Sequence, residues 1–433
     1  ESIVPKFELN YILGNPPFVG ASNMSDEQKK DAVTVFGKMK LSNSIDYVGA
    51  WYYKAAYYIQ NTHIQIGFVS TNSITQGEQV APFWGKLLHE YQIHIDFAYR
   101  TFKWGNEAKG NAHVHCVIIG FSACKNDKVK YLYYENGGKI IASNINSYLV
   151  DAPNILVESR SKPICDVAPM VYGNKPSDGG NLILTEEEKD ELLQKEPFAA
   201  PYIRRYIGAV EFINGTHRYC IWLKGADLSW KKSHQIAQRV QMVREMRLKS
   251  SAEPTREKAE YPQLFFFISQ PDNNYLVIPR VSSERRQYIP IGFLTPDTIA
   301  SDSVSIVPNA TLYHFGILIS NVHMAWMRTV AGRLKSDYRY SGSVVYNTFP
   351  WPTPTDEQKA AIEVAAQEIL NVRNKYSDWS LADLYNTPME ELLRKAHKIL
   401  DKAVWTAYGA HWKSETECVA DLMERYQKLV EGK

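Results

Sequence analysis

The sequence predicts an α/β sheet region, then an α+β region, then an all-α region. Strand-like and helix-like segments alternate over the first 148 residues, which is typical of a sheet covered by helices. Turn signals and short β-type runs dominate from there to residue 352. After the proline-rich hexapeptide 349–354 (FPWPTP), the pattern is helical to the end. We therefore predict three domains, at residues 1–148, 149–352 and 353–433.

The first region begins with a short apolar run, 7–14, which ends at an Asn-Pro-Pro turn. Bulky apolar residues recur at helical spacing over 47–59. The next predicted elements are a strand at 65–70, a helix at 82–91, and strands at 93–97 and 114–121. This order predicts a parallel-type sheet covered on both faces. No glycine-rich strand-to-helix turn precedes the Asn-Pro-Pro turn, so we expect the chain to be a piece of something longer.

Capping signals mark the helices of the other two regions. Thr185 followed by Glu188 predicts one capping box, and 233–249 predicts a basic helix. Thr355 with Gln358 predicts the start of a helix that runs to about residue 375. For the next helix, which stops near Gly409, the predicted N-cap, first-turn proline and capping acid are Thr387, Pro388 and Glu390.

Composition narrows the class of protein. The 433 residues are 45% hydrophobic and 22% charged, as in a globular protein. No apolar run approaches the roughly 20 residues that cross a bilayer, so we expect no membrane partner. The five cysteines form no C-x-x-C pair, so we expect no zinc site and a reducing cytoplasm. The net charge of +2 means that any DNA-binding face is a local cluster.

The tetrapeptide Asn15-Pro16-Pro17-Phe18 directly follows the first predicted strand, at the end where open α/β sheets place ligands. An aryl amine is a poor nucleophile because its lone pair is delocalised into the ring. The Asn15 side-chain oxygen and the Pro16 carbonyl each accept one N–H bond from such an amine, which favours a pyramidal nitrogen. Two prolines rigidify the turn, and Phe18 offers a face for a flipped base. The alternative is that the turn is simply a loop.

The tetrapeptide resembles the Asn/Asp-Pro-Pro-aromatic motif of class I, S-adenosylmethionine-dependent amino methyltransferases. That motif is shared by enzymes that act on DNA, RNA or protein, so it leaves the substrate open. The resemblance implies that the first region is part of a class I methyltransferase Rossmann-like sheet. No cysteine follows a proline, which disfavours the covalent chemistry of cytosine-C5 methyltransferases.

Longer strings resemble the MmeI-type restriction-modification family, and they are spread along essentially the whole chain. They are 67–74 (GFVSTNSI), 77–80 (GEQV), 100–104 (RTFKW) with 106–110 (NEAKG), 281–286 (VSSERR), 332–341 (GRLKSDYRYS) and 346–352 (YNTFPWP). Members are single-chain enzymes with a nuclease, a helical connector, an adenine-N6 methyltransferase, a target-recognition domain and a C-terminal helical domain. The resemblance therefore implies double-stranded DNA and the rest of the same polypeptide as partners. It also implies S-adenosylmethionine, bound mainly by an upstream part, and an isolated chain that turns over poorly.

Carried over to this sequence, Asn15 and Pro16 hold the adenine amine and Phe18 stacks on its ring. Asn15 is also a predicted cofactor contact, and Asp46 either faces the cofactor or is a first-turn helix acid. The segment 102–111 is either a loop that closes over the flipped base, with Lys103 and Lys109 on phosphates, or a β-hairpin with core aromatics. His113 and His115 alternate on a strand, but no third ligand is evident, so we predict no metal site.

Three basic clusters are candidates for the DNA face, because phosphate contacts supply affinity and arginine reads guanine edges. The first (Lys231, Lys232, Arg239, Arg244, Arg247 and Lys249) is more typical of a solvated helix face. The second and third lie in turn-rich sequence with polar neighbours. They supply the predicted DNA-binding residues Arg280, Ser283, Glu284, Arg285 and Arg286, and Arg333, Lys335, Asp337, Tyr338 and Arg339, with Arg328 nearby. The alternative functions are a DNA-binding module without catalysis and an RNA or protein methyltransferase.

Overall fold

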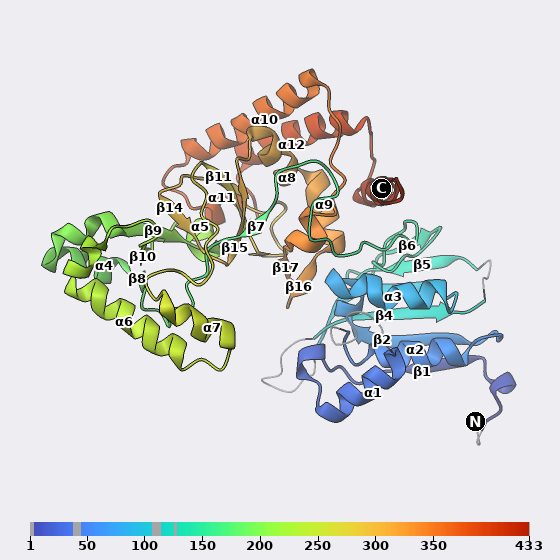
Figure 1. Ribbon diagram of the computed structural model, residues 1–433. Coiled ribbons are helices and arrows are strands. Elements are labelled where there is room, and N and C mark those ends of the chain that lie inside the picture. Colours follow the sequence, from blue (N-terminus) through green and yellow to red (C-terminus); the bar gives the residue numbers. More distant parts are fainter. Residues whose placement is uncertain (1–3, 38–44, 106–113, 125–127, 433) are drawn as a thin grey trace. The chain divides into compact units, whose positions relative to one another are not determined.

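The computed structural model describes residues 4–37, 45–105, 114–124 and 128–432 (Figure 1). The chain forms two compact units, each assembled from separate stretches of sequence. Unit 1 comprises Glu1–Cys165, Ala325–Trp351 and His411–Lys433. Unit 2 comprises Asp166–Met324 and Pro352–Ala410. The linear domain boundaries that we predict are a different division of the chain, and they stay a prediction.

A six-stranded sheet forms the centre of unit 1, in the order β1-β2-β4-β3-β5-β6. Its strands are β1 (Tyr11–Gly14), β2 (Gln65–Thr71), β3 (His94–Trp104), β4 (Val114–Ser122), β5 (Lys130–Tyr133) and β6 (Lys139–Ala142). Two pairs, β1/β2 and β3/β5, are parallel, whereas β4 is antiparallel to both β2 and β3. The expected parallel-type sheet is therefore a mixed one. The connection between β3 and β4 is too short for a parallel crossover, which needs about a dozen residues.

Helices cover one face of this sheet. They are α2 (Gly49–Tyr58) and α3 (Val80–His89), and α1 (Asp26–Phe36) packs on α2 through the rings of Phe36 and Tyr53. The buried Tyr52 ring of α2 lies 5.3 Å from Phe68 and 5.3 Å from Phe121, between ring centroids. On the other face, Leu13 is 78% exposed and Phe97 is 37% exposed. The expectation of two covered faces is therefore wrong at these positions of the described chain.

The rest of unit 1 comes from later in the sequence. Strands β16 (Gly332–Leu334) and β17 (Asp337–Arg339) form an antiparallel hairpin, which is followed by a helical turn, Gly342–Tyr346. Helix α9 (Asn321–Val330) precedes the hairpin, and its residues from Ala325 onward belong to unit 1. Helix α13 (Glu415–Glu431) buries Leu422, Met423 and Tyr426, and the Tyr426 hydroxyl accepts a hydrogen bond from the Glu158 amide at 3.1 Å. Sequence reasoning did not anticipate α1, whereas α13 lies in the region that the sequence predicts to be helical.

Unit 2 contains two small four-stranded sheets, β14-β9-β10-β8 and β13-β11-β15-β7. The strands are β7 (Val171–Tyr172), β8 (Ile183–Leu184), β9 (Ile203–Ile207), β10 (Tyr219–Ile221), β11 (Tyr275–Pro279), β13 (Gly292–Leu294), β14 (Thr298–Ala300) and β15 (Val304–Pro308). A further short strand is β12 (Val281–Ser282). The helices are α4 (Glu186–Lys195), α5 (Ala209–Asn214), α6 (His234–Leu248), α7 (Glu253–Glu257), α8 (Leu312–Ile319), α10 (Asp356–Lys375), α11 (Leu381–Tyr385) and α12 (Glu391–Tyr408). Helix α8 packs on α10 with no room between them, because a Cβ on Gly316 would lie 2.7 Å from Ile362 Cγ2.

The predicted helix starts are largely confirmed. Capping boxes begin α4 at Thr185 and α10 at Thr355, and Ser233 caps α6. The prediction for α12 is wrong, because its N-cap is Glu390 and not Thr387. The Glu390 carboxylate itself accepts the Leu393 amide at 2.7 Å, whereas the Thr387 hydroxyl donates to the Arg285 carbonyl at 2.8 Å.

The predicted fold class is confirmed, with an α/β region, then an α+β region, then helices. In the described part of the chain, none of the helices combines the length and the apolar character that crossing a bilayer requires.

Candidate functional site

The carboxyl ends of β1, β2, β3 and β5 all lie at one edge of the unit 1 sheet, because β3 runs in the same direction as β2. This carboxyl edge is where open α/β sheets bind ligands. It carries the residues that follow each strand: the turn Asn15–Phe18 after β1, Asn72 and Ser73 after β2, and Tyr134 after β5. The sequence prediction therefore places the turn correctly at the end of a strand.

The four residues of the turn differ in their exposure to solvent. Pro16 is buried, Asn15 and Pro17 are exposed, and Phe18 is half-buried. The ring of Phe68 lies under the start of the turn, because a Cβ on Gly14 would be 3.2 Å from it. The turn is thus seated on the apolar core of the sheet, and its residue Asn15 is exposed.

Asp46 braces the residues that follow the turn. Its Oδ1 accepts the Ala21 amide at 2.9 Å, and its Oδ2 accepts the hydroxyl of Ser73. The neighbouring Tyr47 amide donates to the Val19 carbonyl at 2.9 Å. Helix α2 begins only at Gly49, so Asp46 lies before the first turn of the helix. The predicted first-turn role is therefore wrong, and the predicted cofactor contact of Asp46 stays a prediction.

An open depression of about 500 Å³ lies at the same edge. It is lined by Arg100, Thr101, Tyr134, Glu135, Asn136 and Arg333. The Arg100 guanidinium lies 5.4 Å from the centre of the Tyr134 ring. Arg333 comes from the hairpin β16–β17, so this depression brings a predicted DNA-binding arginine to the carboxyl edge. Sequence reasoning missed Arg100 as a site residue, although its place beside the predicted loop 102–111 and the aromatics there was a usable signal.

The predicted loop at 102–111 begins as a β-hairpin, since Lys103 pairs with His115 and Trp104 with Val114 across β3 and β4. The aromatics are not core residues, because Trp104 is 44% exposed. Lys103 is exposed, and its amide donates to Glu135 Oε1 at 3.1 Å. Lys109 and His113 lie outside the described residues. Among the residues that are described, no group of histidine, cysteine, aspartate or glutamate side chains is arranged to hold a metal ion.

The hairpin β16–β17 displays the third basic cluster. Arg339 and Lys335 are exposed, Asp337 is half-buried, and Lys335 has a positive φ of 58° at the tip. Arg333 stacks on Tyr338, with its guanidinium carbon 3.7 Å from the ring centre. Arg328 is engaged elsewhere, in an ion pair with Glu415 at 2.6 Å. The hairpin therefore offers Lys335 and Arg339 as accessible cations.

The second cluster lies in unit 2, on the turn after β12. Glu284 and Arg285 are exposed, Ser283 is half-buried, and the Ser283 hydroxyl accepts the Arg285 amide at 3.3 Å. Arg286 donates to Asn386 Oδ1 at 3.1 Å. Arg280 points inward, because it donates to the Asp302 carbonyl at 2.9 Å and lies 4.4 Å from the centre of the Tyr172 ring. The structure thus leaves Arg285 the more accessible cation and gives Arg280 a structural contact.

Comparison with known proteins decides the family. The description "MmeI, DNA-methyltransferase domain" matches residues 1–134, "MmeI, target recognition domain" matches 151–353, and "MmeI, C-terminal domain" matches 354–432. A solved structure of the type IIL restriction-modification enzyme MmeI in complex with DNA matches 98% of this chain, with 50% identity and a TM-score of 0.90. The chain belongs to the MmeI family. It is also similar to DNA methyltransferase A of Bacillus subtilis (strain 168), with 43% identity over 97% of the chain. The chain spans 48% of that relative and 57% of the MmeI chain.

The first basic cluster, residues 231–249, is more than a solvent-exposed helix face. Arg239 pairs with Glu188 at 2.8 Å. Arg247 is fully buried and donates to five backbone carbonyls, those of Pro176, Ser177, Lys258, Tyr261 and Leu264. Arg247 therefore joins α6 to two neighbouring loops and is not available to DNA.

Cys116 is excluded as a catalytic nucleophile because it is buried. Cys116 lies on β4, opposite Thr71 of β2, and is fully buried. Burial raises the pKa of its thiol to about 11. The thiolate needed for covalent attack on a pyrimidine is therefore scarce at neutral pH.

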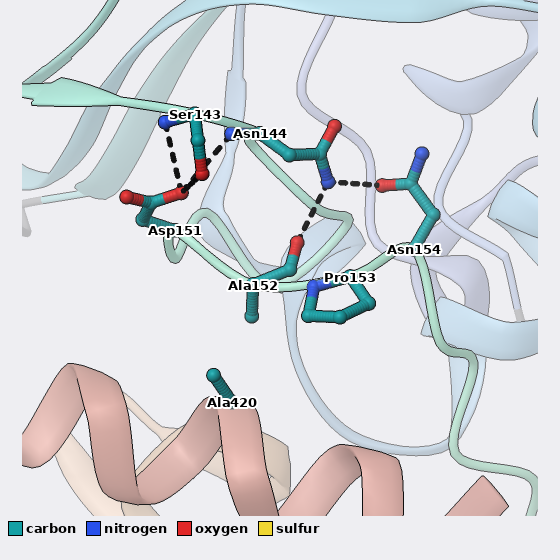
Figure 2. Close-up of a pocket in the computed structure, with 7 residues that line it drawn as sticks. All are labelled: Ser143, Asn144, Asp151, Ala152, Pro153, Asn154 and Ala420. Carbon is teal, nitrogen blue, oxygen red and sulfur yellow. Dashed lines mark hydrogen bonds between the residues drawn. The ribbon is translucent and has the colours of Figure 1, made fainter. Parts of the chain in front are cut away.

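A second depression in unit 1 is lined by residues that form hydrogen bonds with one another (Figure 2). Asp151 Oδ1 accepts the Ser143 amide, the Ser143 hydroxyl and the Asn144 amide at 3.0, 2.8 and 3.0 Å. The Asn144 side-chain amide bridges the Ala152 carbonyl and Asn154. These bonds fold the chain back after β6, towards Ala420 of α13, so we assign them to packing.

Proposed function

We propose that this chain carries the catalytic turn and the DNA-reading residues of a site-specific DNA adenine-N6 methyltransferase that belongs to a restriction-modification enzyme. The observation that carries the proposal is the exposed Asn15 amide on a rigid turn at the carboxyl edge of the sheet. Its family membership supports DNA methylation as the reaction.

The proposed reaction uses the turn as an amine holder. The Asn15 side-chain oxygen and the Pro16 carbonyl accept hydrogen bonds from the two N–H groups of an adenine N6 amine. These bonds favour a pyramidal nitrogen, whose lone pair is directed away from the ring. Phe18 stacks on the flipped base, since an enzyme that acts on a base must take it out of the helix. S-adenosylmethionine, when bound, supplies the methyl group.

The described residues fit the amine-receiving side of such a site better than the cofactor side. Each oxygen of Asp46 accepts one hydrogen bond, from Ala21 or from Ser73, so we assign Asp46 to holding the turn. The chain spans 48% of the length of the Bacillus subtilis relative. We therefore propose that the cofactor is held mainly by other residues of the full-length protein, and that the isolated chain binds DNA without turning over.

The proposed substrate is double-stranded DNA in a prokaryotic cytoplasm. The accessible cations Lys335 and Arg339 on the hairpin, and Arg285 on the turn after β12, support phosphate and base contacts. The similar MmeI structure is a complex with DNA, and the target-recognition match covers both segments. A DNA-binding module without catalysis and an RNA or protein methyltransferase are the competing functions.

The test is methyl transfer by the full-length gene product. Purified protein with labelled S-adenosylmethionine is expected to label unmethylated duplex DNA at adenine N6, in one sequence context. Asn15→Ala is expected to lower kcat at least about 100-fold while DNA affinity stays within about two-fold, because it removes an acceptor used in the reaction but no phosphate contact. Label on RNA, on protein or on cytosine would overturn the proposal, as would equal loss of binding and activity.

A further inference from the structure

We propose that residues 73–79, together with Asp46, form a positioning element that holds the catalytic turn and the hairpin β16–β17 at a fixed distance from each other. All of these residues lie in unit 1. The inference rests on the proposed methyltransferase function and adds residues that touch neither the base nor the cofactor.

One end of the element holds the catalytic turn. Val19 and Ala21 follow Phe18 closely in sequence, and both are fixed through their backbones. The Ala21 amide donates to Asp46 Oδ1 at 2.9 Å, and the Val19 carbonyl accepts the Tyr47 amide at 2.9 Å. The exit of the turn therefore moves only if Asp46 moves.

The middle of the element holds Asp46. The Ser73 hydroxyl donates to Asp46 Oδ2, and Gln79 Oε1 accepts the Asp46 amide at 3.4 Å. The segment between Ser73 and Gln79 is itself anchored in the core. Ile74 is fully buried, and its carbonyl accepts the indole N–H of Trp84 at 2.8 Å. Asp46 is thus fixed to the loop that follows β2.

The other end of the element meets the hairpin. Gly77 is buried with a φ of +68°, and a Cβ there would lie 3.1 Å from the Cα of Gly332, the first residue of β16. Glu78 Oε1 accepts the hydroxyl of Ser343 at 2.5 Å. Ser343 lies in the helical turn that follows β17. This one loop therefore contacts the first residue of β16 and the helical turn that follows β17.

This arrangement gives the reaction a fixed spacing. The hairpin carries the predicted DNA contacts Arg333 and Arg339, while the turn carries the base. A displacement of about 1 Å at a reacting centre can cost about 100-fold in rate. Because the element sets where the turn lies relative to the hairpin, its loss is expected to lower kcat and leave DNA binding in place.

The experiment compares matched variants of the full-length gene product. Gly77→Ala is paired with Gly225→Ala, because both glycines have positive φ, at +68° and +75°, but nothing lies within 4 Å of a Cβ on Gly225. Glu78→Ala is paired with Glu90→Ala, which removes another exposed carboxylate of the same unit. Asp46→Asn is paired with Asp46→Ala, since an asparagine oxygen still accepts the Ala21 amide.

Three readouts are measured: kcat and KM for unmethylated duplex DNA, amide hydrogen exchange at Ala21 and Tyr47, and the melting temperature. We expect Gly77→Ala and Glu78→Ala to lower kcat by about 10- to 100-fold with KM for DNA within about two-fold, and to speed exchange at Ala21. Neither change is expected in the two controls, and Asp46→Asn is expected to keep more activity than Asp46→Ala.

Equal effects in each matched pair, or a rise in KM with unchanged kcat, would overturn the positioning element. So would losses of kcat that simply follow the melting temperature in all variants. If the unmodified protein transfers no methyl group, the proposed function fails. The exchange rates at Ala21 and Tyr47 still decide, in that case, whether the element holds the turn.

Discussion

At the residue scale, two arginines predicted to bind DNA differ in what surrounds them. Arg339 is exposed on β17, whereas Arg280 donates to the Asp302 carbonyl and stacks on Tyr172. Arg339→Ala is therefore expected to weaken DNA binding and to reduce the slope of log affinity against log salt by about one. Arg280→Ala is expected to leave that slope unchanged and to cost about 2 kcal/mol of folding free energy. Fluorescence anisotropy at several salt concentrations and denaturant unfolding measure the two effects, and a reversal of the two outcomes would contradict the assignment.

The same scale shows what the sequence can predict of a site. Asn15 to Phe18 could be placed because a strand followed by Asn-Pro-Pro is a local pattern. Asp46 could not be assigned, because its partners Ala21 and Ser73 lie 25 and 27 residues away in sequence. Arg280 and Arg285 look alike in sequence and differ only through tertiary contacts. Residue type and spacing therefore located the turn, and the fold decided which charges remain accessible.

At the element scale, helix starts were predictable because capping is local. Thr185 and Thr355 both satisfy the amide of the residue three positions on, as their sequences predict. The direction of β4 and the true cap of α12 depended on longer-range contacts, such as the bond from Thr387 to Arg285. Strands that need distant partners, such as β11, which pairs with β15, appeared in the sequence only as short β-type runs between turns.

The buried Arg247 gives a prediction for a whole element, helix α6. Its guanidinium donates to five carbonyls from two loops, and a lysine has neither the donors nor the planar geometry to replace it. Arg247→Lys is expected to destabilise unit 2 by at least about 3 kcal/mol, because several buried carbonyls lose their partners. Arg244→Lys, on an exposed position of the same helix, is the control and should change stability by less than about 0.5 kcal/mol. Urea unfolding measures both, and similar values for the two variants would contradict the structural role.

At the scale of the whole molecule, both compact units depend on the C-terminal helices. Helices α10 and α12 pack against α8 in unit 2, where Ile362 and Leu400 meet Gly316. Helix α13 belongs to unit 1, where Met423 Sδ accepts the side-chain amide of Asn146 at 3.3 Å and Tyr426 holds the Glu158 amide. The C-terminal helices are therefore divided between the two units, with α10 and α12 in unit 2 and α13 in unit 1.

Deleting residues 411–433 tests this interdependence. The deletion removes α13 and exposes the surface on which Val419, Leu422, Met423 and Tyr426 are buried. Each buried apolar side chain contributes about 1.5–3 kcal/mol, so the loss is comparable with the entire stability of a typical domain. Amides of β2 and β4 in unit 1 are expected to lose most of their protection from hydrogen exchange, while those of β11 and β15 in unit 2 keep it.

Methylation should then be lost before DNA binding, because the catalytic turn is in unit 1 and the turn that carries Arg285 is in unit 2. Unchanged protection of β2 and β4 would show that α13 does not stabilise unit 1. Uniform loss of protection in both units would show that the chain unfolds as one cooperative body.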